Sequence, residues 1–384
     1  MESLRLPVGG GTETYRLKGP RSFQRPARPF NRKALAAAHV VADPRSTKDP
    51  WLEAAIDWDA TLAYRRHLWS WGFGVAEAMD TAQRGMGLDW PASLRLIEKT
   101  LGEAKGIEGA EVWSGAGTDH LAPGRHSIED IIAAYEAQCA AIEKLGGRII
   151  LMASRALAAA ARAPEDYARV YDRILGQVRQ PVILHWLGEM FDPALEGYWG
   201  AKDHDAAMEA CLSVLRKNAS KVDGIKISLL DKDKEIAMRR KLPEGLRMYT
   251  GDDFNFAELI EGDAEGHSDA LLGIFDAIAP AASEALSFLS ENKTTRYHEI
   301  LQPTVPLSRH IFQAPTRFYK TGVVFMAWLN GHQEHFVMVG GQQSARSVLH
   351  FAELFRLADA AGLLADPALA VRRMRQLLAV HGCE

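Results

Sequence analysis

The sequence predicts an α/β protein of the (β/α)8 TIM-barrel class, with an irregular leader before the barrel and a helical extension after it. The main observation is an alternation of eight short apolar segments with longer segments of helical spacing. Strand–helix units of this kind pair their strands in parallel, and eight of them close into a barrel of about 250 residues. An open doubly wound sheet is the competing arrangement, but the segment VVADPRSTKDP after the first strand has no glycine-rich phosphate loop. The expected boundaries are 1–34 for the leader, 35–290 for the barrel and 291–384 for the extension.

Each predicted strand is followed by a predicted helix, and two of these helices have clear signals. Leu94, Ile97 and Leu101 recur at the spacing of one helix face. Ser127 and Asp130 form the pattern of a capping box at the start of the next helix. The eight predicted strands are residues 34–43, 72–79, 109–117, 147–154, 180–186, 222–228, 245–251 and 268–275.

The two ends of the chain differ from the alternating middle. The leader is rich in Gly, Pro and Arg, which indicates irregular structure laid on the barrel. Residues 325–341 and 345–364 look helical, so we expect the extension to cover the barrel, to form an interface, or both.

Composition and charge are those of a globular protein. The chain has 384 residues, of which 47% are hydrophobic and 24% charged. The formal net charge of −4 gives no reason to expect a nucleic acid or a membrane as a partner. The three cysteines form no CxxC pair, and the N-terminus has no apolar core of signal-peptide length. We therefore expect a cytoplasmic protein, because unpaired cysteines are typical of reducing compartments.

The segment VDGIKIS, residues 222–228, places a lysine inside a stretch that otherwise has the character of a buried strand. Side chains alternate along a strand, so Lys226 points into the barrel if the two isoleucines face the helices. A lysine in a partly dry site has a lowered pKa and a usable neutral amine. Such an amine can attack a carbonyl group and form an imine. The alternative is a structural lysine that is paired with Asp252 or Asp253.

Four short motifs carry a resemblance to a known family. The chain has Gly-Ile-Lys at 224–226, Gly-Asp-Asp at 251–253, Ala-Pro at 279–280 and Ala-Gly-Thr at 116–118. In these motifs and their spacing, most of the chain resembles the dihydrodipicolinate synthase and N-acetylneuraminate lyase superfamily. Its leader and extension are most similar to an uncharacterised dihydrodipicolinate synthase-like family of unknown function. The resemblance implies a TIM barrel, class I aldolase chemistry with Lys226 as the Schiff-base lysine, and a homo-oligomer.

The chain departs from the family pattern at two strand ends. In better-known members the second strand ends in Gly-Thr-Thr-Gly-Glu, which holds the carboxylate of an α-keto acid. The matching stretch GVAEAMDTAQRG has Glu77 and Asp80 instead, and repulsion by these acids argues against pyruvate as the substrate. The fifth strand of those enzymes ends in a tyrosine that shuttles protons, where this chain has His185. Because histidine titrates near neutrality, we expect His185 to act as an acid or base; the alternative is a core histidine bonded to a backbone carbonyl.

Together these observations predict a Schiff-base-forming lyase or aldolase of carbohydrate metabolism. Its substrate is expected to be a keto sugar, a sugar-acid derivative or a related small carbonyl compound, and no cofactor is required. Lys226 and His185 are the predicted catalytic residues. Carboxylates accept hydrogen bonds from sugar hydroxyl groups well, which favours acids among the binding residues. The predicted substrate-binding residues are Glu77, Asp80, Gly117, Thr118, Asp119, Ser228, Asp252 and Asp253.

Two other functions stay open on the sequence alone. Carboxylates and histidines are numerous at the predicted strand ends, and such clusters hold a divalent metal ion in sugar isomerases and metal-dependent aldolases. In that alternative, a metal-dependent sugar isomerase or lyase binds the ion through His185, Glu189, Asp252 and His267. The third alternative is a barrel that binds sugars without catalysis.

Overall fold

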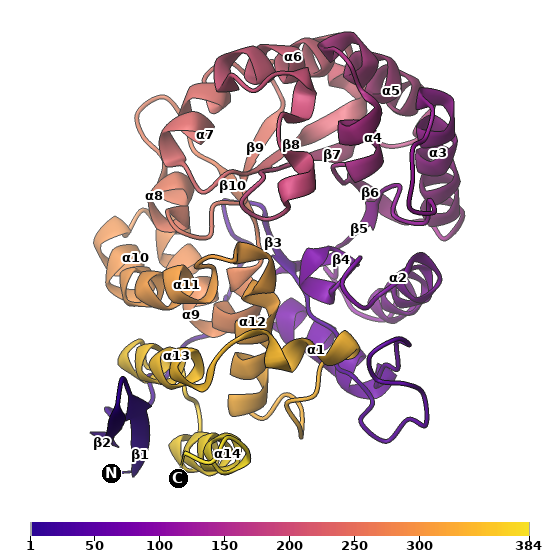
Figure 1. Ribbon diagram of the computed structural model, residues 1–384. Coiled ribbons are helices and arrows are strands. Elements are labelled where there is room, and N and C mark those ends of the chain that lie inside the picture. The colour runs from indigo at the N-terminus through magenta and orange to yellow at the C-terminus, as the bar shows by residue number, and fades with distance from the viewer. Residues whose placement is uncertain (1, 384) are drawn as a thin grey trace.

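The computed structural model describes residues 2–383, and eight parallel strands form a closed barrel at its centre (Figure 1). Around the barrel the strand order is β10-β3-β4-β5-β6-β7-β8-β9. Each strand coincides with one of the eight predicted segments, which confirms the TIM barrel. The strands are β3 (Ala34–Ala37), β4 (Gly74–Glu77), β5 (Val112–Ala116), β6 (Arg148–Leu151), β7 (Val182–Leu187), β8 (Val222–Ser228), β9 (Arg247–Thr250) and β10 (Asp269–Leu272).

Helices follow the strands and surround the barrel (Figure 1). The predicted capping box is present: Ser127 Oγ accepts a hydrogen bond from the Asp130 N–H, and the Asp130 carboxylate accepts one from the Ser127 N–H. The barrel helices are α1 (Trp58–Ser70), α2 (Trp90–Ala104), α3 (Ile128–Lys144), α4 (Arg155–Ala160), α5 (Pro164–Gln177), α6 (His204–Lys217), α7 (Lys232–Arg239), α8 (Phe256–Glu261) and α9 (Ile274–Ser290).

The alternation of side chains along the strands separates an inner core from an outer core. Inside the barrel, bulky side chains of different strands pack together, among them Trp113, Ile183 and Tyr249. Ile225 and Ile227 of β8 belong to the outer core, which lies between the strands and the helices. Because its interior is filled, the barrel offers a ligand room only at its ends.

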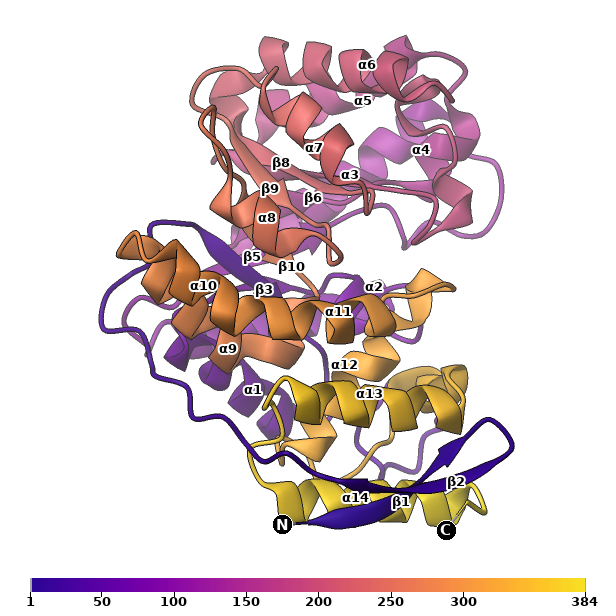
Figure 2. The same cartoon turned by 90° about the vertical axis from the view of Figure 1, so that its left-hand side faces the viewer.

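Further helices extend from the side of the barrel where α1 and α9 lie (Figures 1 and 2). The helix predicted over 325–341 ends at Leu329, because the chain turns at Gly331, whose φ is 80°. The helix predicted over 345–364 is present over Val348–Ala360, and Ser347 caps its N-terminus. Within residues 2–383, no helix is both long and apolar enough to cross a membrane. The helices of the extension are α10 (Thr294–Leu301), α11 (Val305–Ile311), α12 (Tyr319–Leu329), α13 (Val348–Ala360) and α14 (Pro367–Val380).

The composition predicts an irregular leader, but the first part of the leader is a β-hairpin. Strands β1 (Ser3–Val8) and β2 (Gly11–Arg16) pair in antiparallel register and pack on α13 and α14 (Figure 2). The Tyr15 hydroxyl donates a hydrogen bond of 2.7 Å to the Asp359 carboxylate of α13. An isolated two-stranded hairpin is marginal in water, so the extension stabilises this one.

One buried acid on α7 predicts a pH dependence of stability. Burial raises the pKa of Glu235 to about 8, although the Ser268 hydroxyl donates a hydrogen bond to it. An acid whose pKa is raised by folding stabilises the protein below its unfolded pKa and loses that contribution as the pH rises through the folded value. The wild type should therefore lose on the order of 3–5 kcal/mol of stability between pH 5 and 9, and Glu235→Gln should not show this loss.

Urea unfolding of both proteins across this pH range measures the difference. Glu244→Gln, an exposed acid in the turn after α7, is the control and should follow the wild-type profile. Parallel stability profiles for the wild type and Glu235→Gln would contradict the raised pKa of Glu235.

Candidate active site at the barrel mouth

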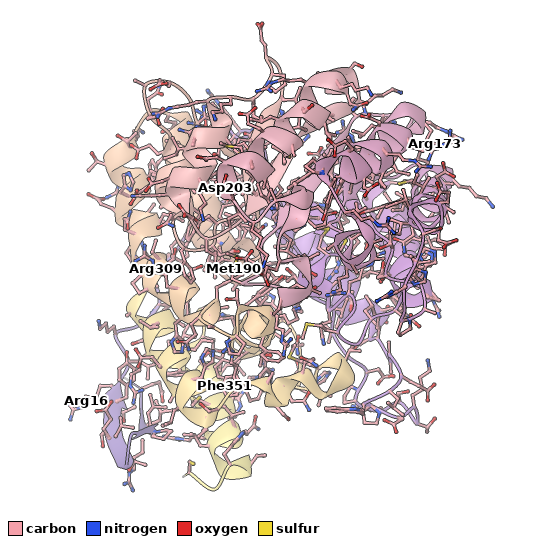
Figure 3. The ribbon with its side chains drawn as sticks, turned by 45° about the horizontal axis from the view of Figure 1, so that its top comes forward. Arg16, Arg173, Met190, Asp203, Arg309 and Phe351 are labelled. Atoms are coloured by element: carbon pink, nitrogen blue, oxygen red, sulfur yellow. The ribbon has the colours of Figure 1, made fainter. Side chains whose placement is uncertain are left out.

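Strands β7 and β8 place His185 and Lys226 side by side at the C-terminal end of the barrel. The two residues are directly paired in the parallel register. Met190, in the loop after β7, marks this end of the barrel in Figure 3. Lys226 is only 8% exposed and lines a cavity of about 10 Å³, which has room for about one water molecule. The other polar side chains around this cavity are those of Asp80, Thr81, His185, Ser228, Asp253 and Tyr319.

The surroundings of Lys226 favour an uncharged amine. Burial lowers the pKa of Lys226, and the negative charges of Asp253 and Asp80 offset part of that shift. Among the described residues, none forms a hydrogen bond or an ion pair with the Lys226 Nζ atom. The lysine is therefore not locked in a closed ion pair, which was the structural alternative to a reactive amine.

Gly251, directly after β9, leaves the space that Lys226 occupies. A Cβ atom at Gly251 would lie 2.6 Å from Lys226 Cε and 2.7 Å from the Ile227 carbonyl oxygen, and it would also overlap Ser228 Oγ. Real Cβ atoms do not approach so closely, so any larger residue here must displace the lysine or its strand.

Gly251→Ala should therefore lower stability by about 1–3 kcal/mol and change the reactivity of Lys226. Denaturant unfolding measures the stability. The rate at which a small amine-reactive compound modifies Lys226 measures the reactivity. Gly176→Ala, on α5, is the control: apart from its own helix, no described residue has an atom within 4 Å of the added Cβ, and the change should stabilise the helix by about 0.5–1 kcal/mol. Unchanged stability and reactivity in Gly251→Ala would contradict the close packing.

The surroundings of His185 disfavour its charged form. Burial lowers its pKa well below the usual value, and the nearby Lys226 charge adds to the shift. Its Nε2 atom shares a hydrogen bond of 3.1 Å with Ser228 Oγ. Its Nδ1 atom is buried and has no partner among residues 2–383. A neutral imidazole of this kind can accept a proton.

A larger cavity of about 490 Å³ adjoins the Lys226 cavity at the mouth, since Asp80, His185 and Leu187 line both. Its wall includes four of the predicted binding residues, namely Asp80, Gly117, Thr118 and Asp119. Together the two cavities are large enough for a small carbonyl compound.

The carboxylate of Asp119 is already engaged by an arginine of the β4–α2 loop. Arg84 donates two hydrogen bonds to it, of 2.7 and 3.0 Å, and Gln138 donates a third of 3.1 Å. Burial acts to raise the pKa of Asp119, but the hydrogen bonds and charge of Arg84 outweigh it and lower that pKa. Asp80 differs, because its half-buried carboxylate forms no side-chain hydrogen bond with any described residue.

Two of the predicted substrate-binding acids, Glu77 and Asp252, are engaged by protein groups and do not line the cavities at the mouth. Glu77 is fully buried in an ion pair of 2.8 Å with Arg65 of α1, and Thr100 also donates to it. The carboxylate of Asp252 accepts hydrogen bonds from Phe254 and Asn255 and supports the turn after β9. Neither lines the two cavities at the mouth.

Asp253 remains at the site as a buried neighbour of Lys226. It lines the small cavity, and its Oδ1 atom accepts a hydrogen bond of 2.9 Å from the Ile274 N–H. Burial raises the pKa of Asp253, while that hydrogen bond and the Lys226 charge oppose the shift.

The residues proposed for a metal ion are not brought together. His267 is exposed and precedes β10, so it lies at the opposite end of the barrel from His185. Glu189 is also exposed, and Asp252 is held in its turn. Within residues 2–383, no group of three His, Cys, Asp or Glu side chains is arranged to hold a metal ion.

The extension contributes residues to the mouth that the motifs do not reveal. Tyr319, at the start of α12, lines the Lys226 cavity, and its hydroxyl lies 2.7 Å from Thr81 Oγ1. Phe312 stacks on the Tyr319 ring with 4.3 Å between ring centroids. The next residue, Lys320, is buried as well. A lysine in the otherwise apolar segment YKTGVVFMAWL is the same signal that singles out Lys226.

Comparison with solved structures shows a shared fold with dihydrodipicolinate synthases. The dihydrodipicolinate synthase of Aquifex aeolicus superposes with a TM-score of 0.65 at 13% identity, over 87% of this chain and 99% of that one. A prophage protein of the dihydrodipicolinic acid synthase family from E. coli K12, in complex with pyruvate, gives the same four values. The 4-hydroxy-tetrahydrodipicolinate synthase of Methylacidiphilum fumariolicum SolV has a TM-score of 0.63 at 14% identity, over 90% of this chain and 99% of that one.

The comparison with curated proteins returned no match. The family model for a protein of unknown function, DUF993, matches residues 4–383, which is nearly the whole sequence including the hairpin and the extension. The resemblance to dihydrodipicolinate synthases is thus confirmed for the fold, and the chain belongs to the DUF993 family.

Proposed function

We propose that this protein is a Schiff-base-forming lyase of the class I aldolase type, acting on a keto sugar, a sugar-acid derivative or a related carbonyl compound. The observation that carries the proposal is the Lys226 amine, which is buried, free of ion pairs among residues 2–383, and set beside a cavity. The shared fold with dihydrodipicolinate synthases supports the same class of chemistry.

In the proposed reaction, the neutral Lys226 amine attacks the substrate carbonyl carbon and forms a carbinolamine. Loss of water gives an iminium ion, which withdraws electrons from the adjacent carbon–carbon bond. When that bond breaks, its electron pair forms an enamine, and the departing fragment leaves as an aldehyde. The hydroxyl proton of that fragment passes to His185, whose buried Nδ1 atom has no hydrogen-bond partner among residues 2–383. Return of the proton to the enamine carbon, followed by hydrolysis, releases the second product and restores the amine.

The polar groups around the cavities have different proposed tasks. Asp80 has an unengaged carboxylate that can accept a hydrogen bond from a substrate hydroxyl group. Thr118 and the backbone at Gly117 line the larger cavity and would contact the same substrate. Ser228 orients His185 through its hydrogen bond, and Asp119 orients Arg84. The Tyr319 hydroxyl, with Thr81, is a second group through which a proton could pass.

Reductive trapping tests the proposed function. The protein is incubated with a panel of keto sugars, sugar acids and simple keto acids, and borohydride is then added. Borohydride reduces an imine to a stable secondary amine, and peptide mass mapping locates it. We expect an adduct on Lys226 for at least one compound, and none when borohydride is added before the carbonyl compound. The absence of an adduct across the whole panel would contradict imine chemistry.

A further inference from the structure

A third cavity at the mouth, of about 360 Å³, is lined by three cationic side chains. These are Arg155 at the start of α4, and Arg317 and Lys320 around the start of α12. The cavity adjoins the Lys226 cavity, because Asp80 and Tyr319 line both. A molecule that extends from Lys226 into this cavity therefore meets these cations.

Lys320 is a buried cation without a counterion. It is 2% exposed, and its Nζ atom contacts the Met86 sulfur atom at 3.1 Å. Within residues 2–383, no carboxylate forms an ion pair with it. Burial lowers its pKa to about 8; Asp80 opposes the shift, and the Arg155 charge adds to it. Its Nζ atom also lies 5.3 Å from the centroid of the Tyr319 ring. Neither a thioether nor a neutral ring supplies a counter-charge, so the protein bears a desolvation cost that a bound anion would relieve.

The balance of charge around this cavity is positive. Arg317 is exposed and forms no ion pair or hydrogen bond with another described side chain. Arg155 is paired with Asp192. Asp80 is the remaining acid, and it lies on the wall shared with the Lys226 cavity. The part of the cavity near Lys320 and Arg317 is therefore suited to an oxyanion.

We propose that Lys320 and Arg317 bind an oxyanion, a carboxylate or a phosphate, at the end of the substrate remote from the carbonyl group that meets Lys226. The substrate class is then an anionic carbonyl compound. On sequence alone, repulsion by Glu77 and Asp80 at the end of β4 argues against such a substrate. The anion site stands on its own geometry, and its link to a carbonyl substrate rests on the proposed imine chemistry.

Calorimetric titration with inorganic phosphate and with malonate tests the anion site. The full chain should bind at least one of these anions, and Lys226→Met should bind it as tightly as the wild type. Lys320→Met should weaken binding about tenfold or more, because a charge-assisted hydrogen bond is lost. Arg317→Gln should weaken it less, and Lys293→Met, an exposed lysine paired with Glu291 in the same extension, is the control that should change nothing.

Unchanged binding in Lys320→Met, or no binding of either anion by the wild type, would overturn the proposal. Melting temperatures guard against a folding artefact. Lys320→Met should be at least as stable as the wild type, because it removes an uncompensated buried charge. A structural lysine would instead lose stability on substitution. Arg317→Gln lies at the surface and provides a second variant in which the fold is not at issue.

Trapping with matched probes tests the link to the substrate. Dihydroxyacetone phosphate is compared with dihydroxyacetone, and 4-oxopentanoate with 2-pentanone, so that the two arms distinguish phosphate from carboxylate. We expect the anionic member of one pair to give more adduct on Lys226, and Lys320→Met to abolish that preference. Equal yields for charged and neutral probes would overturn the anion assignment. No adduct with any probe would contradict the imine proposal and leave the titration result as the separate test of the anion site.

Discussion

Lys226→Met should abolish the trapped adduct and lower any turnover on the order of 10³-fold or more, while the protein stays folded. A thioether cannot form an imine, so the covalent step is lost outright. Stability should be equal to or higher than that of the wild type, because the lysine is buried and unpaired among residues 2–383. Mass mapping after borohydride treatment and a thermal melt measure both effects.

Two further variants decide which amine reacts. Lys226→Arg keeps a long basic side chain but presents a guanidinium that stays protonated, so it should form no adduct either. Lys320→Met removes the other buried amine at the mouth and should keep the adduct on Lys226 when a neutral carbonyl probe is used at saturation. An adduct that persists in Lys226→Met and maps to Lys320 would show that the assignment of the nucleophile is wrong.

Glu77→Gln should lower the free energy of unfolding by about 3–5 kcal/mol, which is a large share of the stability of a typical domain. The substitution leaves the Arg65 guanidinium buried without a counter-charge, since both side chains of this ion pair are fully buried. Breaking such a pair from one side costs far more than the pair contributes when intact. The denaturant midpoint at constant m value measures the loss.

The neighbouring pair of Arg66 and Glu103 provides the matched control. It also joins α1 to an acid on another element, but its side chains are 47% and 28% exposed. Glu103→Gln should therefore cost no more than about 1 kcal/mol. If Glu77 had a role in substrate binding, Glu77→Gln would also reduce trapping at a temperature where the variant is folded. We expect no such reduction, and a loss of adduct in the folded variant would restore the original prediction.

The barrel could be predicted from the sequence because its signals are local. A buried parallel strand is a short apolar run, and a helix has its own spacing and caps, as Ser127 and Asp130 show. The orientation of Lys226 follows from the same kind of evidence. Side chains alternate along β8, so placing Ile225 and Ile227 against the helices turns the lysine inward.

The acids of the site could not be assigned in this way. Glu77 and Asp80 are near neighbours with the same chemistry. Glu77 forms an ion pair with Arg65 of α1, whereas Asp80 lines the cavity at the mouth. Asp252 and Asp253 differ in the same way. Asp252 supports the turn after β9, and Asp253 lines the Lys226 cavity. A carboxylate accepts hydrogen bonds from whichever donor the fold brings to it, and the sequence does not show that Arg65 of α1 meets Glu77 or that the turn after β9 encloses Asp252.

Taken alone, the sequence determined the parallel barrel and the inward direction of Lys226, because periodicity and strand order are properties of the chain itself. The tertiary structure decided which charges are neutralised, which are left free, and that Tyr319 and Lys320 of the extension complete the mouth. Burial and the choice of counter-charge depend on residues that meet only when the chain is folded, and those two quantities set the pKa values on which the chemistry rests.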